Sequence, residues 1–323
     1  MKAAYNLRYG KPSEVIEVGE FAKPRPRDGE VLIKVHVSSV NRTDCGFLLA
    51  KPWIVRFFSG LLVPKNKVLG CEFAGEVVEI GKGVKRFKVG DRVFGFDDDT
   101  FGGHGEYMAI GENKMLTNIP DNVGYETAGV ASEGSHYFLE YLRASGVSKG
   151  DKVFVNGGTG AIGSAAIQIL VSMGVRVDAT AGSENIELVK SLGAKKVIDY
   201  TKEDFTELDE KFDWVFDSVG KCSYHMSKKI LKKGGIFMAS EFGPRFSNVY
   251  LSLWTKIFGA VGEHKVKFPL PKNSLEDLEY IRGLLESGKF KPVVDKTYQL
   301  EEIVDAYEYV LTGTKVGNVV VKL

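Results

Sequence analysis

Residues 153–170 read VFVNGGTGAIGSAAIQIL, and this stretch decides how the whole chain is interpreted. A Val/Phe strand is followed by a glycine-rich turn and then by an Ala/Ile-rich segment typical of a buried helix. Gly158, Gly160 and Gly163 complete the spacing G-x-G-x-x-G. In this pattern the first glycine makes the tight turn, the second lets a pyrophosphate approach the backbone, and the third lets the helix pack closely on the strand. The stretch therefore predicts a dinucleotide-binding turn.

The sequence around this turn alternates short apolar strands with helical segments. The expected strands read KVFVNGG, RVDATAG, KVIDY, WVFDSVG and GIFMASEFG, and the expected helices read SAAIQILVSMG, ENIELVKSLGA and HMSKKILKKG. Alternation of this kind builds a parallel sheet covered on both faces. A glycine-rich turn can match the spacing by chance and bind nothing. Here it stands at the first strand–helix junction of the series, where the mechanism requires it, and we interpret it as a cofactor site.

The two ends of the chain have a different pattern. The first third is β-rich, with Val-rich stretches such as GEVLIKVHVSSV at 29–40 separated by glycine-containing turns. The last fifty residues predict two amphipathic helices at 274–288 and 300–313 and a terminal strand at 317–323.

Composition excludes several classes of protein. The chain has 323 residues, enough for two domains, with 44% hydrophobic and 26% charged residues, as in ordinary globular proteins. A formal net charge of +1 does not attract nucleic acid, and no apolar run is long enough to span a bilayer. Three cysteines and an N-terminus without a signal peptide's apolar core argue for a reducing compartment. We expect a cytoplasmic protein with no stable membrane insertion.

The turn after the second strand, in VRVDATAGSEN at 175–185, bears on the choice of dinucleotide. An acid there would bind the ribose of NAD, whereas small hydroxyl residues accommodate the 2′-phosphate of NADP. Thr180, Gly182 and Ser183 are expected in the turn, and no acid is. Asp178 is the competitor, at the distance typical of NAD enzymes, but it falls inside the strand. The sequence favours NADPH.

Taken together, four stretches resemble the medium-chain dehydrogenase/reductase superfamily: GCEFAGEVVEIGKGVKRFKVGDRVFG, VNGGTGAIG, LVKSLGAKKVIDY and DWVFDSVG. The resemblance covers the chain in order and is strongest to the zinc-free quinone oxidoreductase and enone reductase branch. It implies an α/β fold in which a Rossmann doubly wound parallel sheet is inserted into a GroES-like β-rich domain. The expected boundaries are 1–130 and 271–323 for the GroES-like domain and 131–270 for the Rossmann domain. The resemblance also implies a homodimer.

The zinc alcohol dehydrogenases of this superfamily hold a catalytic zinc at three positions. By motif these fall on Asn41, on Cys71 in GCE, and near Glu133 in ASEGSHY. Asn is a poor zinc ligand, so zinc is not expected. A set of Cys45 with Cys71, Glu133 and His104 is chemically possible, but both cysteines are better interpreted as small buried apolar residues.

Without a Lewis acid, a simple carbonyl or alcohol loses several kcal/mol of charge stabilisation. Hydride transfer to a quinone or an α,β-unsaturated carbonyl is less demanding, because the developing charge spreads over a quinol or enolate that hydrogen bonds can hold. We therefore predict an NADPH-dependent oxidoreductase acting on a small hydrophobic acceptor of these two kinds. The alternatives are a zinc-type alcohol dehydrogenase with unusual ligands and a catalytically idle NADPH-binding protein.

By resemblance, Asn41 would donate a hydrogen bond beside the nicotinamide or the substrate oxygen, and Thr43 would pass a proton to the product. A hydroxyl that caps the backbone is an equal interpretation of Thr43. Tyr200 matches a tyrosine near the adenosine phosphate, or is an ordinary strand-end aromatic. We expect the cofactor to contact Asn41, Gly158, Thr159, Gly160, Ala161, Ile162, Gly163, Thr180, Gly182, Ser183, Tyr200, Val219 and Gly243. Flat apolar side chains that suit a planar acceptor are Trp53, Phe57, Phe58, Phe96 and Trp254, although the core is the default place for each.

Overall fold

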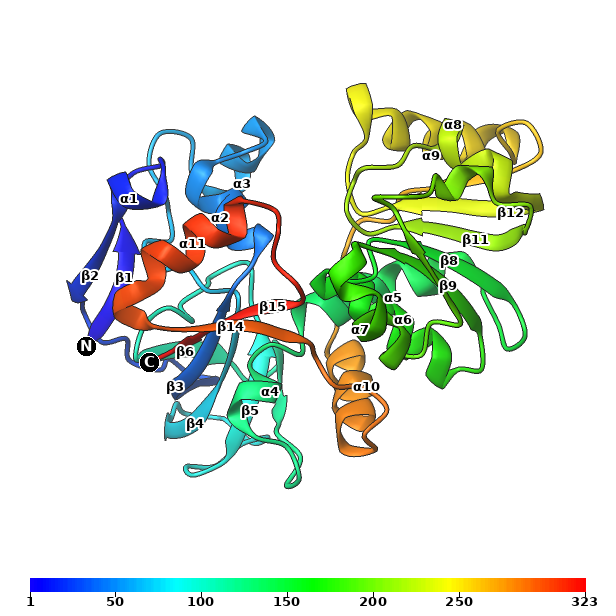
Figure 1. The fold of residues 1–323 in the computed structure, drawn as a ribbon. Coiled ribbons are helices and arrows are strands. Elements are labelled where there is room, and N and C mark those ends of the chain that lie inside the picture. Colours follow the sequence, from blue (N-terminus) through cyan, green and yellow to red (C-terminus); the bar gives the residue numbers. More distant parts are fainter. The chain divides into compact units, whose positions relative to one another are not determined.

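The structure, a computed structural model, describes residues 1–323 and divides them into two compact units. Unit 1 comprises Met1–Glu133, Asn273–Gly288 and Pro292–Leu323. Unit 2 comprises Gly134–Lys272 with Lys289–Lys291. Figure 1 shows the blue and red ends of the chain in unit 1 and the green and yellow middle in unit 2.

Unit 2 is built on a six-stranded sheet in which every neighbouring pair is parallel. Its order is β10-β9-β8-β11-β12-β13, so the chain steps outward from β8 first in one direction and then in the other. The strands are β8 (Lys152–Asn156), β9 (Arg176–Ala181), β10 (Lys196–Asp199), β11 (Phe212–Asp217), β12 (Leu231–Ala239) and β13 (Lys265–Lys267). The predicted doubly wound parallel sheet is confirmed.

Helices connect these strands and contact the sheet; α6, for example, packs on β8 and β9 (Figure 1). The helices are α5 (Glu133–Ser145), α6 (Ala161–Ser172), α7 (Ile186–Ser191), α8 (Tyr224–Ser227) and α9 (Ser247–Phe258), with 3-10 turns η2 (Ser183–Asn185), η3 (Phe205–Glu207), η4 (Lys228–Ile230) and η5 (Pro244–Phe246). The prediction of one helix over 225–234 is wrong. Helical structure there ends at Ile230, and β12 begins at Leu231 because Leu231 and Phe212 pair in the sheet.

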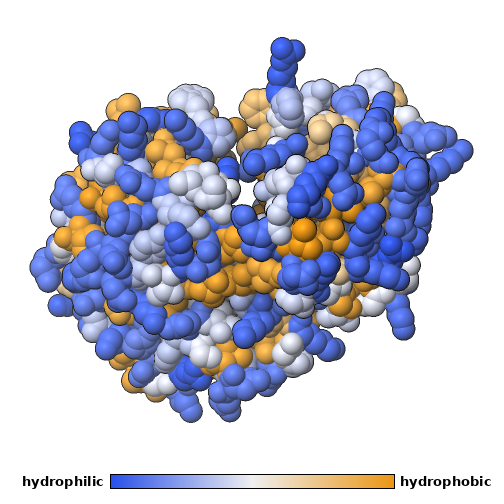
Figure 2. Space-filling model, in the orientation of Figure 1, coloured by the Kyte–Doolittle hydropathy of each residue, from blue (hydrophilic) through white to orange (hydrophobic).

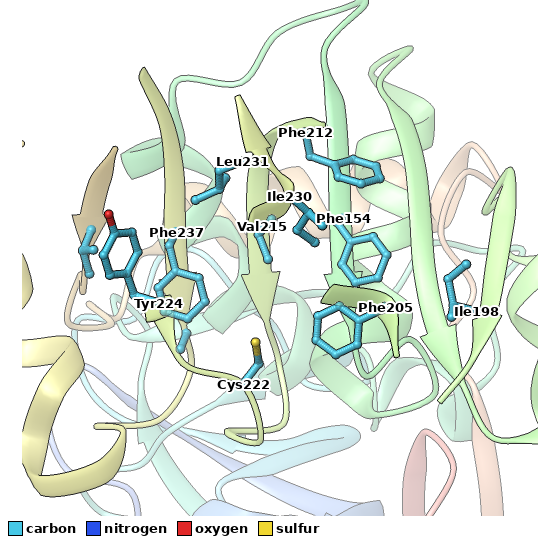
Figure 3. Packing of buried hydrophobic residues seen from close by; sticks show 12 residues of the cluster. Phe154, Ile198, Phe205, Phe212, Val215, Cys222, Tyr224, Ile230, Leu231 and Phe237 are labelled. Carbon is cyan, nitrogen blue, oxygen red and sulfur yellow. The ribbon is translucent and has the colours of Figure 1, made fainter. Parts of the chain in front are cut away.

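Apolar side chains from β8, β11 and β12 meet helical residues in the core of unit 2 (Figure 3). The rings of Phe154 and Phe205 stack with centroids 5.1 Å apart, and Phe212 meets Phe154 at 5.2 Å. Burying such rings removes large apolar areas from water. This packing buries Phe154 of β8, and the glycine-rich turn begins at the end of that strand.

Unit 1 is β-rich. Its seven-stranded sheet has the order β14-β15-β3-β4-β5-β7, with β6 also paired to β3, and β1 and β2 form a separate antiparallel pair. The strands are β1 (Lys2–Asn6), β2 (Ile16–Glu20), β3 (Glu30–Val40), β4 (Glu72–Ile80), β5 (Arg92–Phe96), β6 (Tyr107–Gly111), β7 (Met115–Asn118), β14 (Val294–Gln299) and β15 (Asn318–Lys322). The C-terminal β15 pairs with β3, so both ends of the chain build this sheet.

The helices of unit 1 are short except for α10 and α11. They are α1 (Pro12–Val15), α2 (Arg42–Leu49), α3 (Arg56–Ser59), α4 (Tyr125–Ala128), α10 (Leu275–Glu286) and α11 (Ile303–Leu311), with 3-10 turns η1 (Trp53–Val55) and η6 (Leu300–Glu302). The helix α2 follows β3 directly and carries the sequence RTDCGFLL. It therefore brings Thr43, Asp44 and Cys45 to the end of β3.

Hydrophilic side chains cover most of the face drawn in Figure 2, with smaller apolar areas between them. None of the helices has the length and apolar character needed to cross a membrane. Of the aromatic residues considered for an acceptor pocket, Phe96 is buried in β5, whereas Trp53, Phe57, Phe58 and Trp254 are more than half exposed. These four side chains are therefore not part of the core, which was the default interpretation for each.

Candidate active site

The glycine-rich turn connects β8 to α6. Gly157 has a φ of +89°, a conformation that glycine adopts without a Cβ clash. Gly158 does not have a positive φ, and a Cβ there would lie 3.0 Å from both Ile167 Cδ1 and Val189 Cγ1. Gly160 N donates to Gly157 O at 3.3 Å, so Gly158 is the second residue of the tight turn, where the sequence places it. Gly157 supplies the positive φ, and Gly158 also lies against apolar side chains of α6 and α7.

The other two glycines of the pattern have different surroundings. A Cβ on Gly163 would lie 2.1 Å from Gly157 O and 2.8 Å from Ser218 Oγ, so only glycine lets α6 come this close to the turn. A Cβ on Gly160 would meet only Gly157 O, at 3.8 Å. A side chain at position 160 would therefore extend into open space.

This open space adjoins the first turn of α6, whose backbone N–H groups have no acceptor within the helix. Thr159, Ala161 and Ile162 are partly exposed beside it. Free N–H groups and the positive end of the helix dipole favour an anion. A cradle that a Cβ would fill, next to such a helix end, fits the pyrophosphate of a dinucleotide.

Val219 and Gly243 follow β11 and β12, at the same ends of the parallel strands as the turn. A Cβ on Gly157 would lie 2.4 Å from Val219 Cγ1, so Val219 lies against the turn. Gly243 has a φ of +73°, and a Cβ there would lie 2.6 Å from Ser247 Oγ. The backbone at Gly243 therefore requires glycine with or without a cofactor.

Thr180 is buried inside β9 and is not in the turn after it, which corrects the prediction. Its Oγ1 accepts a hydrogen bond from Gly157 N at 2.8 Å and donates one to Asn156 Oδ1 at 2.8 Å. The hydroxyl thus ties β9 to the glycine-rich turn. The strand continues to Ala181, so the turn begins at Gly182.

Asp178 is buried in β9, with 1% of its surface exposed, and its Oδ2 lies 3.2 Å from Arg176 Nη2. Burial raises the pKa of this carboxyl, and the Arg176 charge opposes that effect. A carboxylate that is buried in the sheet and ion-paired with Arg176 is not available to a ribose. The structure therefore gives no support to the NAD interpretation based on Asp178.

The turn after β9 meets the end of β10. Ser183 Oγ donates to Asp199 Oδ2 at 2.5 Å, and the Tyr200 side chain is 61% exposed beside Gly182. Hydrogen bonds from Ser183 and Thr201 hold the pKa of Asp199 well below its usual range. The carboxylate is therefore ionised, and both of its oxygens already accept hydrogen bonds within the chain. Ser183, Gly182 and Tyr200 lie together, as expected for one binding surface.

In unit 1, four hydrogen bonds converge on the carboxylate of Glu72, which is fully buried at the start of β4. Ser39 Oγ donates at 2.8 Å and Asn41 Nδ2 at 3.0 Å to Oε2, while the backbone N–H groups of Ser132 and Glu133 donate to Oε1. Burial nevertheless raises the pKa of Glu72 to about 7. Glu72 therefore joins β3, β4 and the start of α5.

Asn41 is one of the donors and is itself 2% exposed. Its Nδ2 donates to Ser39 Oγ at 2.7 Å as well as to Glu72 Oε2, so both amide hydrogens are used within the chain. The donation to nicotinamide or substrate that the resemblance implies would need one of these bonds to break. Asn41 is also the N-cap of α2, and its backbone N–H donates to Asp44 Oδ2 at 3.0 Å.

Asp44 is completely buried and organises the segment before β4. Its Oδ1 accepts hydrogen bonds from Gly70 N at 3.1 Å and Cys71 N at 3.2 Å, and Cys71 Sγ lies 3.8 Å from Oδ2. Burial, followed by the negative charge of Asp44, raises the pKa of the Cys71 thiol well above its ordinary value. Cys71 is therefore held as a neutral thiol.

Thr43 and Glu133 form a second pair. Thr43 Oγ1 donates a hydrogen bond to Glu133 Oε1; Thr43 is partly exposed, whereas Glu133 is 6% exposed. Burial, followed by the charges of Asp44 and Glu72, raises the pKa of Glu133 well above its ordinary value. Lys315, in the loop before β15, opposes this effect, and burial lowers the pKa of Lys315 itself.

These residues do not fit a zinc ion. The Asn41 amide points its hydrogens at acceptors, Cys71 is a thiol bound to Asp44, and no three His, Cys, Asp or Glu side chains are grouped as metal ligands. Zinc takes thiolate, neutral imidazole and carboxylate ligands. His104, the remaining candidate, bonds through its ring to Ser39 O at 2.8 Å and to Tyr307 OH at 3.3 Å.

The sequence did not single out Glu72, Asp44 or Lys315 as site residues. Glu72 stands in the quoted GCE motif, so a signal for it existed. Asp44 stands at the third residue of α2, a position typical of capping boxes. Lys315, in TGTKVGN, carries no motif, and only the fold brings it to Glu133.

Two family profiles match the chain. Residues 27–133 match the family described as alcohol dehydrogenase GroES-like domain, and residues 192–321 match the family described as zinc-binding dehydrogenase. The first match agrees with the β-rich unit 1 that the resemblance implied. The three positions examined for zinc lie outside the second match.

Among curated relatives, the 2-methylene-furan-3-one reductase of Solanum lycopersicum is 34% identical over 99% of this chain and 79% of its own length. The chloroplastic NADPH-dependent alkenal/one oxidoreductase of Arabidopsis thaliana is 32% identical with the same coverage. Among solved structures, the quinone oxidoreductase from Coxiella burnetii superposes with a TM-score of 0.88 at 27% identity, covering 100% of this chain and 99% of that one.

Proposed function

Because the chain belongs to the quinone oxidoreductase branch of the medium-chain dehydrogenase/reductase superfamily, we propose that it reduces quinones or α,β-unsaturated carbonyls with NADPH and without zinc. It is an oxidoreductase that uses a nicotinamide cofactor. The relatives named above reduce a methylene-furanone and alkenals or alkenones, and a quinone oxidoreductase shares the fold. All three kinds of acceptor contain a C=C bond conjugated to a carbonyl group.

One observation carries the proposal from these relatives to this chain. At the place where zinc enzymes bind metal, the Asn41 amide is hydrogen-bonded to Glu72 and the Cys71 thiol to Asp44. Such a site offers hydrogen bonds and protons but no Lewis acid. An acceptor whose developing charge is delocalised is the substrate class that such a site can serve.

In this proposal the bound NADPH supplies the hydride. The turn from Gly157 to Gly163 binds the pyrophosphate at the first turn of α6, with Gly160 leaving the space that the phosphates need. Gly182, Ser183 and Tyr200 bind the adenosine end, and the sequestered Asp178 leaves room for a 2′-phosphate. Thr43, partly exposed at the start of α2, passes a proton to the reduced acceptor.

The test is the oxidation of NADPH by purified protein with an enal, a cyclic enone, a benzoquinone and a saturated ketone. We expect turnover with the first three and little with the ketone, and a lower KM for NADPH than for NADH. Reduction of the ketone alone, with zinc bound and lost together with activity, would favour the zinc-type dehydrogenase. Quenching of NADPH fluorescence without turnover would favour an idle binding protein. A cytoplasmic homodimer remains a prediction for cell fractionation and sedimentation.

A further inference from the structure

We propose that Glu133 stores the proton that completes the reduction and delivers it to the acceptor through the Thr43 hydroxyl. This inference rests on the proposed function, because it assigns the source of the proton in that reaction. Glu133 acts through Thr43 and does not touch the acceptor itself.

The geometry of the pair is that of a short proton path from the interior to the surface. Glu133 Oε1 is hydrogen-bonded to Thr43 Oγ1, and Thr43 is partly exposed. The other carboxyl oxygen, Oε2, is buried and has no hydrogen-bond partner in the chain. Leaving a charged oxygen without a partner costs several kcal/mol, whereas a protonated carboxyl tolerates this place better. Thr43 is therefore the outer end of the path and Glu133 the inner end.

Glu133 has a backbone position that is fixed independently of Thr43. Its backbone N–H donates to Glu72 Oε1 at 2.9 Å, and the residue is the first of α5. This hydrogen bond fixes the backbone from which the Glu133 side chain extends, and the hydrogen bond from Thr43 Oγ1 holds the carboxyl itself. A fixed donor within hydrogen-bond reach is the first requirement for general acid catalysis.

The charged groups around Glu133 come from several elements. Asp44 from α2 and Glu72 from β4 raise its pKa, burial raises it further, and Lys315 from the loop before β15 lowers it. The neighbouring thiols of Cys45 and Cys71 are neutral, because burial raises the pKa of both. Burial and the unpartnered Oε2 therefore favour the protonated, neutral form of Glu133. Once it has lost its proton, Lys315 and the N-terminus of α5 stabilise the carboxylate.

The step balances as follows. The acceptor receives two electrons and one hydrogen as hydride from the cofactor, which forms a C–H bond and leaves the negative charge on an enolate or quinolate. The Thr43 O–H bond then breaks as its proton bonds to the acceptor. The Glu133 O–H bond breaks as its proton bonds to Thr43 Oγ1. Glu133 is left as a carboxylate, which takes a proton from water along the same path before the next turnover.

The experiment compares four variants of the full chain with the unaltered protein. Glu133→Gln keeps an acceptor for Thr43 but carries no acidic proton, and Thr43→Ala removes the hydroxyl, whereas Thr43→Ser keeps it. The matched control is Glu279→Gln, because Glu279 also accepts a threonine hydrogen bond, from Thr117 Oγ1 at 2.6 Å, away from this site. Rates with an enone are measured across a range of pH, together with NADPH affinity by fluorescence.

We expect Glu133→Gln to lower kcat by about 100-fold with NADPH affinity unchanged, the size typical of a lost general acid. The fall of kcat with rising pH in the unaltered protein should disappear in this variant. Thr43→Ala should lose as much, the double variant no more than either, and Thr43→Ser and Glu279→Gln little. Infrared spectra near neutral pH should show a protonated-carboxyl band, to which Glu72 also contributes, that is weaker in Glu133→Gln, whatever its activity.

An unchanged pH profile and kcat in Glu133→Gln, or a protonated-carboxyl band that persists in it undiminished, would overturn the inference and leave the proposed function intact. Failure of the unaltered protein to reduce any enone or quinone would refute the proposed function itself, and this inference with it.

Discussion

Replacing Glu72 by Gln tests how the buried carboxyl in unit 1 contributes to stability. Glu72 is fully buried, and burial raises its pKa from 4.5 to about 7 in the folded chain, although four donors surround it. A carboxyl whose folded pKa is raised stabilises the fold through its neutral form. That contribution is complete below pH 4.5 and is lost as the pH rises to about 7. Glutamine has nearly the same shape but does not titrate.

The magnitude follows from the two pKa values. A difference of about 2.5 units, at about 1.4 kcal/mol each, gives a loss of about 3 kcal/mol over this pH range. The free energy of unfolding of the unaltered protein should therefore fall relative to that of Glu72→Gln by about 3 kcal/mol between pH 4.5 and pH 7. Groups away from Glu72 titrate alike in both proteins and cancel in the difference, whereas the pKa of Glu133 falls slightly when the Glu72 charge is removed.

Urea unfolding at several pH values, followed by circular dichroism and by hydrogen exchange of β4, measures this difference for unit 1. Ser39→Ala serves as a second variant. The Ser39 hydrogen bond lowers the pKa of Glu72, so its removal should move the end of the loss to higher pH. Stability curves that run parallel for Glu72→Gln and the unaltered protein across the range would refute the reasoning.

Three further predictions concern the cofactor and the metal. Gly160→Val should leave the melting temperature within a few degrees but abolish NADPH binding by calorimetry, because its side chain would fill the open cradle; Gly163→Ala should instead lower stability by about 1–3 kcal/mol, because its Cβ would overlap Gly157 O. Asp178→Asn should leave the NADPH-to-NADH preference within about twofold, because the carboxylate is buried against Arg176; a larger change in the ratio of KM values would place Asp178 at the ribose. Dialysis against a zinc chelator should leave enone reduction unchanged, and about one zinc per chain lost with activity would contradict this.

The glycine-rich turn shows how far the pattern in the sequence reaches. The spacing of Gly158, Gly160 and Gly163 located the turn between β8 and α6 and predicted the parallel sheet around it. It did not identify the glycine with a positive φ, because two adjacent glycines, Gly157 and Gly158, can both serve. Only the backbone, in which Gly157 has a φ of +89°, distinguishes them.

Element boundaries were less predictable, because tertiary pairing sets them. Thr180 was expected in a turn, yet β9 continues to Ala181 since Ala181 pairs with Asp199 of β10. The helix α9 was not predicted at all. Apolar residues continue on its exposed side at Leu253, Trp254 and Ile257, so the sequence lacks the polar stripe that reveals a surface helix.

The hydrogen-bond network around Glu72 in unit 1 could not be predicted from the sequence, for a different reason. The resemblance drew attention to Asn41, Cys71 and Glu133 one at a time, as positions of lost metal ligands. The structure connects two of them through Glu72, whose side chain accepts from the Asn41 amide and from the Glu133 backbone. No spacing in the sequence encodes such a connection, because it depends on β3, β4 and Glu133 coming together within unit 1.

This connection also changes the interpretation of Asn41. Both of its amide hydrogens bind Ser39 and Glu72, so a substrate oxygen would have to displace a buried hydrogen bond to reach them. The Thr43 hydroxyl donates to Glu133 Oε1, but unlike an amide nitrogen it can also accept, so Oγ1 can take a proton from Glu133 as it gives one to an acceptor. We therefore infer that Asn41 positions Glu72, and that Thr43 is the residue through which this site acts on its substrate. Asn41→Ala should then lower stability, whereas Thr43→Ala should lower kcat.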